Sequence, residues 1–549
     1  MQVFMQPLEK LTEYEEIRSR LSKNQGLLQL SGCVESQKAH MIYGLFDGMK
    51  KDRGLLDANC LVIAENDLKA KELYEDYRLY DRDVYLYPAK DLIFFQADVH
   101  GNLLTKERMK VIAALLEGKG ITVVTSMGGC MDYLLPLEVI RNHTLHFKSD
   151  SPLDMDKLKG QLLGMGYERN AQAEAPGQFS MRGGIVDIFP LTRENPVRIE
   201  LWGDEIDSIR SFDAESQRSI ENLEEIRIYP AAEMVLDREV LEKGIKAIEK
   251  EKKAMVKKFR DNFLTEEAAR LNSAVEESID SLKEFQDFSA AEHFVRYFYK
   301  SPVTFLDYFP QDNTLIFLDE TNRLLEQGNA VETEFRESME HRLEKGYLLG
   351  GQTDLLMSCR QVVQKLNRRN CVSLCTIEQK RGEWDIKEQF HTTAKSVSPY
   401  NNSFELLVKD MKHFKKNGYQ VLLLSGSRTR AARLAQDLTQ EGITSFYSED
   451  RDRLLAPGEV MTAFGHAKRG FEYPLIKFVV ITESDIFGQE KKKKRKRSEY
   501  SGKRIQSFSE LSIGDYVVHE NHGLGVYKGI EKITVDKVAK DYIKIEYAG

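Results

Sequence analysis

The first 145 residues alternate short apolar runs with segments in which apolar residues recur at helical spacing. Short apolar runs bounded by polar residues are typical of strands that are buried on both faces of a parallel sheet. We therefore expect an open α/β sheet here, with helices between its strands. The expected strands are residues 26–31, 60–64, 84–87 and 120–125, and the expected helices are 65–80 and 105–117.

From about residue 143 the pattern changes to near alternation of apolar and polar positions. Residues 179–190 and 197–202 alternate in this way, and Gly183-Gly184 and Gly203-Asp204 punctuate them. This pattern indicates antiparallel strands joined by tight turns. Because α/β segments lie on both sides of the region, we expect a small α+β domain inserted into the α/β fold.

Residues 237–288 have strong helical periodicity, with charged residues on the solvent face. The pattern predicts a solvated helical hairpin that packs on a sheet. A buried strand is then expected at 314–320, and it ends in two acidic residues, Asp319 and Glu320.

The last part of the chain contains a second small α/β unit at about 400–488. After it, residues 514–519 and 541–547 alternate around glycine turns, which predicts the start of a small β-barrel. Between the two lies a run, residues 491–504, that carries nine basic residues and one acid.

The charge of the chain is unevenly distributed. Lys and Arg number 79 against 87 Asp and Glu, so the formal net charge is −8, although the basic run alone carries +8. An acidic body with one basic segment favours protein partners and at most local contact with nucleic acid. The basic run is interpreted as a solvated linker, with phosphate contact as the alternative.

Neither membrane insertion nor export is indicated. The chain has no apolar run of the roughly 18–20 residues that span a bilayer, and its first residues lack the pattern of an export signal. Six cysteines in 549 residues do not form a disulfide framework, and Cys371 and Cys375 lack a second ligand pair at metal-finger spacing. We expect a cytoplasmic protein without a metal site.

Residues 31–39 occupy the place of a phosphate-binding loop, between a buried strand and a helix. A working loop needs the pattern G-x-x-x-x-G-K-[ST]. Gly32 and Lys38 are in register with it, but Gln37 replaces the second glycine and Ala39 replaces the hydroxyl residue that ligates Mg²⁺. Asp319 and Glu320 resemble the acidic pair of NTPases, which hold Mg²⁺ and activate water. Together these residues indicate a degenerate nucleotide site with no catalytic residue.

The order of these motifs resembles that of a known family. The inserted region, with MRGGIVDIFP at 181–190 and GDEID at 203–207, is similar to the excision-repair protein UvrB. The segment GDYVVHENHGLGVY at 514–527 is similar to the RNA-polymerase-interacting domain of CarD-type regulators. The combination resembles the bacterial transcription-repair coupling factor (Mfd) family over essentially the whole chain.

The resemblance implies a multidomain α/β fold with a degenerate P-loop, UvrB-like core, an inserted α+β domain, a second small α/β domain and a partial C-terminal β-barrel. The implied domains are 1–143 and 234–390 for the two parts of the UvrB-like core, 144–233 for the inserted domain that binds UvrA, 395–490 for the small α/β domain, 491–506 for the basic linker, and 507–549 for the truncated polymerase-binding domain.

The resemblance also implies partners. The inserted domain would recruit UvrA through Arg182, Arg198 and Trp202, since Arg and Trp dominate interaction hot spots. The alternative is that Trp202 belongs to the core and Arg182 caps a turn. The terminal domain would bind the RNA polymerase β subunit, and an edge strand at Lys532, Ile533, Thr534 and Val535 could pair with a strand of that partner.

Family members continue into a motor that uses ATP and Mg²⁺ to move on double-stranded DNA, and no intact P-loop occurs in this chain. We therefore expect an N-terminal portion, from a fragment or a truncated gene, that acts in transcription-coupled nucleotide-excision repair without catalysis of its own. Two alternatives remain open: an UvrB-like damage-verification helicase that still binds ATP, and a stand-alone polymerase-binding regulator.

Overall fold

The computed structural model describes residues 1–21, 23, 26–90, 103–283, 291–380, 382–488, 514, 516–519, 523–535 and 538–547. The predicted basic linker, 491–506, lies outside these residues. No helix in the described ranges is both long enough and apolar enough to cross a membrane.

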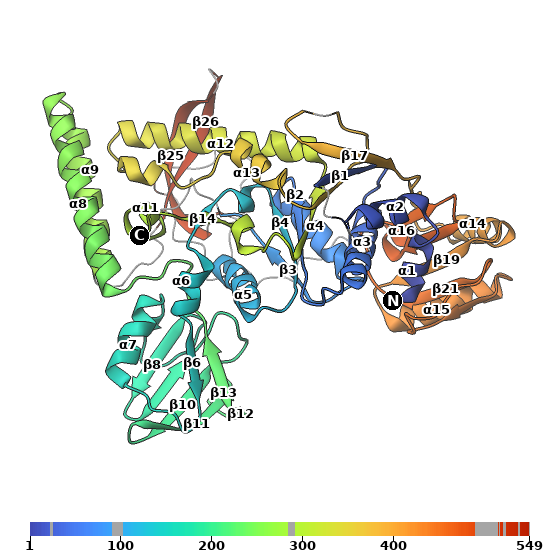
Figure 1. Cartoon of the computed structure of the whole chain (residues 1–549), viewed down its shortest axis with the longest axis horizontal. Helices are drawn as coiled ribbons and strands as arrows, with labels where there is room; N and C mark the ends of the chain where they lie inside the picture. Colours follow the sequence, from blue (N-terminus) through green and yellow to red (C-terminus); the bar gives the residue numbers. More distant parts are fainter. Residues whose placement is uncertain are drawn as a thin grey trace.

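A parallel sheet of seven strands forms the centre of the molecule (Figure 1). Its strand order is β17-β1-β16-β15-β2-β4-β3, so strands from before and after the inserted region pair within one sheet. The strands are β1 (Leu27–Ser31), β2 (Asn59–Ala64), β3 (Val84–Tyr87), β4 (Thr122–Ser126), β15 (Thr314–Asp319), β16 (Cys371–Leu374) and β17 (Ile386–His391). The expected parallel α/β sheet is confirmed, and β1, β2, β4, β15 and β16 are buried along almost their whole length, as continuous apolar runs predict.

Helices cover this sheet, and they precede or connect its strands. They are α1 (Gln2–Leu8), α2 (Thr12–Leu21), α3 (Gln37–Arg53), α4 (Asp67–Tyr77), α5 (Leu103–Glu117), α6 (Leu137–Asn142), α12 (Thr321–Glu344) and α13 (Cys359–Leu366). Short connecting elements are η1 (Gly128–Cys130), β5 (Tyr133–Leu134), β14 (Val303–Thr304), η2 (Phe305–Tyr308) and η3 (Gly350–Thr353).

The inserted region extends from one side of the central sheet (Figure 1). Its six-stranded sheet has the order β12-β11-β10-β9-β8-β7, and all its pairs are antiparallel except β7 with β8. The elements of the whole inserted region are β6 (Leu145–Lys148), α7 (Met155–Gly164), β7 (Glu168–Arg169), β8 (Gln178–Arg182), β9 (Ile185–Ile188), β10 (Val197–Trp202), β11 (Glu205–Phe212), β12 (Ser219–Leu223) and β13 (Glu225–Ile228).

The predicted helical hairpin consists of α8 (Arg238–Asp261) and α9 (Thr265–Lys283). It lies at one end of the molecule (Figure 1), and α8 packs against α9 and the short helix α11 (Val295–Phe298). The expectation that it packs on a sheet was wrong, because α8 packs mainly against α9 and α11 and neither hairpin helix has a described strand among its main contacts. Near its tip, α9 touches the end of α12, where Arg270 donates to the carbonyl of Lys345 at 2.6 Å.

The second α/β unit lies at the other end of the molecule (Figure 1), with strand order β18-β22-β23-β19-β21-β20. Its elements are β18 (Lys395–Ser396), α14 (Phe404–Lys416), β19 (Gln420–Ser425), α15 (Arg428–Gln440), β20 (Ser445–Tyr447), β21 (Val460–Phe464), β22 (Phe471–Tyr473), β23 (Phe478–Thr482) and α16 (Glu483–Phe487). One hydrophobic core is continuous between this unit and the central sheet: Leu28 and Leu30 of β1 belong to it together with Leu422 and Val480. The unit is therefore fixed to the sheet by apolar packing.

The C-terminal strands β24 (Tyr516–His519), β25 (Gly523–Val535) and β26 (Val538–Glu546) form an antiparallel sheet in the order β24-β25-β26. A closed barrel is not formed by the described strands, so the partial barrel stays a prediction.

A buried group of charges joins the inserted region and the helical hairpin to the central sheet. Arg108 of α5 is fully buried and binds Glu233 through two hydrogen bonds, of 2.7 and 3.0 Å. Glu233 lies at the end of the inserted region, and Asp132, which precedes this region, accepts from Arg108 at 3.2 Å. Lys90 links Glu233 to Glu292, which follows the hairpin, at 3.2 and 2.6 Å. We call these five residues the charged hub.

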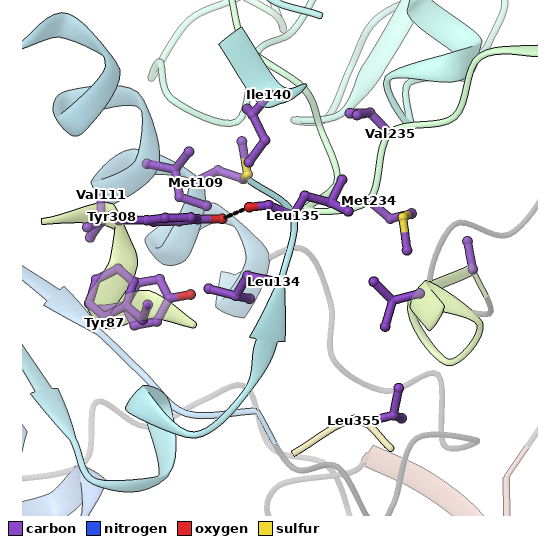
Figure 2. Packing of buried hydrophobic residues seen from close by; sticks show 14 of the residues in the cluster. Tyr87, Met109, Val111, Leu134, Leu135, Ile140, Met234, Val235, Tyr308 and Leu355 are labelled. Carbon is purple, nitrogen blue, oxygen red and sulfur yellow. Dashed lines mark hydrogen bonds between the residues drawn. The ribbon is translucent and has the colours of Figure 1, made fainter. Parts of the chain in front are cut away.

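The surroundings of the charged hub are apolar. The guanidinium of Arg108 lies 4.2 Å from the ring centre of Tyr87, which stacks on Phe305 at 3.6 Å. Figure 2 shows the apolar side chains packed around Tyr87, together with the hydrogen bond of 2.6 Å from the Tyr308 hydroxyl to the Leu135 carbonyl. Burial raises the pKa of both Asp132 and Glu292, whereas Arg108 and Lys90 outweigh the effect of burial at Glu233 and lower its pKa. In so apolar a site, each group can stay charged only because its oppositely charged partners offset the free-energy cost of burial.

Replacing Arg108 with Met should lower the free energy of unfolding of the central sheet by about 3–5 kcal/mol, because it leaves buried carboxylates without their main cation. Native-state hydrogen exchange of the amides in β2 and β4 measures this loss. Arg141→Met is the control, since Arg141 pairs with Glu138 on the surface and should cost less than about 1 kcal/mol. Equal effects of the two substitutions would contradict the role assigned to the charged hub.

Candidate functional site

Gly32 begins the loop that resembles a phosphate-binding loop, and the structure gives a local reason for a glycine there. Its φ is +81°, a conformation that L side chains rarely adopt. A Cβ at this position would lie 2.0 Å from the carbonyl oxygen of Thr392, which follows β17. The close approach of this neighbouring segment therefore requires glycine whether or not a phosphate binds.

Gln37 fills the loop from within. Its side chain is fully buried, its Oε1 accepts from the backbone N–H of Val34 at 3.2 Å, and its Nε2 donates to the Tyr473 hydroxyl at 3.0 Å. A phosphate-binding loop needs free N–H groups that face the ligand. Here one of these N–H groups is bound by a side chain of the same loop.

Lys38 lies next to the two acids that the sequence placed at the end of a strand. Its Nζ is 2.6 Å from Oδ1 of Asp319 and 2.8 Å from Oε1 of Glu320. Glu320 also accepts from the backbone N–H and the hydroxyl of Thr376, at 2.8 and 2.7 Å, and from the Gln379 side chain at 3.2 Å. The structure thus brings Lys38, Asp319 and Glu320 into direct contact. Gly32 instead packs against Thr392, and its N–H donates to the Thr376 carbonyl at 3.3 Å.

The charges of this site compensate one another. Burial by itself would lower the pKa of Lys38, but the two carboxylates outweigh it and raise this pKa above the ordinary value for lysine. Burial raises the pKa of Asp319, although Lys38 opposes this effect. At the less buried Glu320, Lys38 and Thr376 outweigh burial and lower the pKa.

The second α/β unit covers the loop, which the sequence did not reveal. Tyr473 of β22 contacts both Gln37 and His40, and the backbone N–H of Arg469 donates to the Ser36 hydroxyl at 3.0 Å. His40 is fully buried between Tyr473 and the Phe4 carbonyl, and burial lowers its pKa to about 4. Tyr473 and His40 carry no motif and lie 433 residues apart, so only the tertiary structure identifies them as parts of this site.

The predicted UvrA-binding residues lie on the sheet of the inserted region, and they differ in exposure. Trp202 is 84% exposed at the end of β10, which excludes the alternative that it belongs to the core. Half of the Arg182 side chain is exposed, and its guanidinium reaches Asp187 at 3.3 Å. Arg198 is not a free surface residue: it binds Asp187 at 2.6 Å and lies over the Phe212 ring at 4.5 Å.

The predicted polymerase-binding residues Lys532, Ile533, Thr534 and Val535 end β25, which is the middle strand of its sheet and so not an edge strand as a whole. On one side they pair with residues 538–541 of β26. On the other side β24 pairs only with residues 523–526, so among the described strands this side of residues 532–535 has no partner.

No described residues form a cluster of His, Cys, Asp and Glu that could hold a metal ion. All six cysteines are buried and free of disulfides.

Comparison with known proteins gives a consistent picture. A family model of the UvrB interaction domain matches residues 145–234, and one of the CarD-like/TRCF RID domain matches residues 511–549. The transcription-repair-coupling factor of Bacillus subtilis is 34% identical over 528 residues, which cover 95% of this chain and 44% of that protein. That of Staphylococcus haemolyticus is 30% identical over 497 residues, which cover 89% of this chain and 41% of that protein. The chain thus spans less than half the length of these relatives.

The fold defines a multidomain α/β protein that carries a UvrB interaction domain between the strands of its parallel core. Over the 95% of its length that aligns, the chain belongs to the transcription-repair-coupling factor family.

Replacing Lys38 with Met should lower the free energy of unfolding by about 3 kcal/mol at pH 7, because two largely buried carboxylates lose their cation. Part of this loss should be recovered at pH 5. Without Lys38 the pKa of Asp319 rises further, so the folded variant takes up a proton that the unfolded chain does not, and lowering the pH stabilises the fold. Urea unfolding at both pH values measures the effect.

The control is Lys243→Met, since Lys243 pairs with Glu239 on the surface of α8. It should cost less than about 1 kcal/mol at either pH. A Lys38→Met variant that is as stable as wild type at pH 7 would show that the ion pairs contribute nothing to the fold.

Proposed function

We propose that this chain is a portion of a transcription-repair coupling factor that supplies UvrA docking and part of the RNA polymerase contact in transcription-coupled nucleotide-excision repair. The observation that carries the proposal is the presence of a UvrB interaction domain and a CarD-like/TRCF RID domain on one chain. In the complete protein, a motor that uses ATP and Mg²⁺ on double-stranded DNA would release the stalled polymerase. UvrA would then be recruited through the inserted domain.

The degenerate P-loop site would act as a structural junction. ATP with Mg²⁺ does not fit the residues present, because Lys38 is held by two acids, Gln37 occupies the loop, and Ala39 offers no hydroxyl to the metal. The same residues instead connect β15, α3 and the second α/β unit. No observation favours the alternative of a helicase subunit that binds ATP at this site.

Trp202 and Arg182 support UvrA docking at the end of the inserted sheet. A tryptophan that is 84% exposed leaves a large apolar surface in contact with water, which favours a partner that buries this surface. Arg182 keeps half of its side chain exposed and can donate further hydrogen bonds. Arg198 is assigned a positioning role, because it holds Asp187, and Asp187 in turn holds Arg182.

The double variant Arg182→Ala/Trp202→Ala should bind UvrA at least about 30-fold more weakly, since truncating a hot-spot residue costs about 2 kcal/mol or more. Biolayer interferometry with immobilised UvrA measures the affinity. The matched control is Arg218→Ala/Ile220→Ala, two exposed residues at β12, the far edge of the same sheet. Unchanged UvrA affinity in the first variant, or an equal loss in the control, would refute the assigned surface.

Residues 532–535 support polymerase binding by strand addition. The side of β25 without a described strand partner offers backbone N–H and C=O groups to an extended segment of the polymerase β subunit. Such pairing depends on the backbone, so proline, which has no N–H group, tests it directly.

Successive residues of an antiparallel strand turn their N–H groups to opposite sides. Of the single variants Ile533→Pro and Thr534→Pro, one should therefore lose polymerase capture while the β25–β26 amides stay protected in hydrogen exchange. The other should lose that protection. Neither should alter UvrA affinity. If both variants captured the β subunit as wild type does, strand addition at this edge would be wrong.

A further inference from the structure

Helix α8 has a line of five basic side chains on its outer face. They are Lys246, Lys250, Lys253, Lys257 and Arg260, and all five are exposed. Their spacing of four, three, four and three residues places them on one face of the helix. At about 1.5 Å per residue the line is roughly 21 Å long. We call it the basic stripe.

The basic stripe has no part in holding the hairpin together. A different face of α8 contains the buried residues Ile245, Ile248, Val256 and Phe259, which belong to the hydrophobic core. The stripe therefore turns away from the packing interface, and its side chains can be changed without disturbing that interface.

Three acids of the hairpin have partners outside the stripe. Glu239 pairs with Lys243, Glu251 accepts from the Tyr297 hydroxyl at 2.8 Å, and Glu276 of α9 pairs with Lys252 at 3.1 Å. Glu242, Glu249 and Asp261 lie on or beside the stripe, but none of them forms an ion pair with it within the described residues. The stripe thus keeps its positive charge in an otherwise acidic chain.

The stripe ends at an exposed aromatic ring. Phe263 joins α8 to α9, is 91% exposed and has a φ of +64°. A phenylalanine in this left-handed conformation costs about 1 kcal/mol or more. Its backbone N–H donates to the Arg260 carbonyl at 3.0 Å, so the ring is held directly after the last basic residue of the stripe. The left-handed conformation itself closes α8, because it lets the backbone N–H of Leu264 donate to the Phe259 carbonyl at 2.9 Å. The exposure of the ring has no such role in the hairpin, which points to a partner.

We propose that the basic stripe is a DNA contact, in which its side chains follow the phosphate backbone and Phe263 meets an unpaired base at the end of the line. A straight line of like charges matches a polyanion, which presents about one phosphate per 3.4 Å of each strand along the duplex axis. An aromatic ring next to basic groups adds the stacking surface that exposed bases use. This contact is independent of the UvrA and polymerase surfaces, so its failure would leave both of those proposals intact.

The test uses the full chain with Lys250→Gln/Lys253→Gln/Lys257→Gln and a fluorescent 30-base-pair duplex. Fluorescence anisotropy from 50 to 200 mM salt should show that the slope of log affinity against log salt becomes shallower by about 3, roughly one per lost phosphate contact. Lys409→Gln/Lys412→Gln/Lys416→Gln is the matched control, with three exposed lysines at the same spacing on α14. The basic run 491–504 is present in both variants and contributes equally.

The control should leave the slope unchanged. Phe263→Ala should keep the slope of wild type but weaken binding to a duplex with an internal unpaired bubble more than binding to the intact duplex. Three outcomes would overturn the proposal: an unchanged slope in the α8 variant, an equal change in the α14 variant, or competition by polyglutamate as effective as that by DNA of equal charge. The last outcome would assign the stripe to acidic proteins.

Discussion

The buried guanidinium of Arg108 constrains the arrangement of the whole molecule. A fully buried cation is tolerated only when carboxylates surround it. Arg108 receives one from Asp132, before the inserted region, and one from Glu233, at the end of that region, and Lys90 extends the group to Glu292 beyond the hairpin. Any rotation of the inserted region or the hairpin that separated these groups would leave unpaired charges in an apolar environment. The charged hub therefore fixes where two peripheral elements leave the central sheet.

A second buried ionic site, around Lys38, fixes the opposite side of the sheet. Its parts are the ones from which the sequence predicts a degenerate nucleotide site: a loop after β1, a lysine on α3 and two acids at the end of β15. The chain's own carboxylates occupy the place of phosphate charge, and Tyr473 of the second α/β unit closes the loop. Apolar packing between β1 and that unit completes the junction. The two ionic sites together make the α/β part of the chain a frame whose segments are joined by buried contacts.

The proposed docking surfaces lie on elements that project from this frame. Trp202 is at the end of the inserted sheet, the side of β25 without a described partner belongs to the C-terminal sheet, and the basic stripe faces outward from the hairpin. Each surface contains a feature that costs free energy in the isolated chain, namely an exposed indole, backbone groups without a strand partner, or adjacent like charges. A partner that covers the surface would recover this cost. This common property supports a role in recruitment and positioning.

The sequence by itself determined the local elements and the kinds of fold. Continuous apolar runs such as 60–64 predict parallel strands, and alternation in 197–202 predicts an antiparallel sheet, because burial on two faces or on one leaves a distinct period. It also determined that the P-loop is incomplete, since Gln37 and Ala39 are visible without coordinates. Alternation places Arg198 and Trp202 on the same face of β10, so it could not predict that Trp202 is exposed while Arg198 is partly buried. The partners of Arg108 and the contact of Tyr473 with Gln37 were decided only by the tertiary structure. They join residues up to 436 positions apart, and no local pattern records which distant side chain will supply a countercharge or a hydrogen bond.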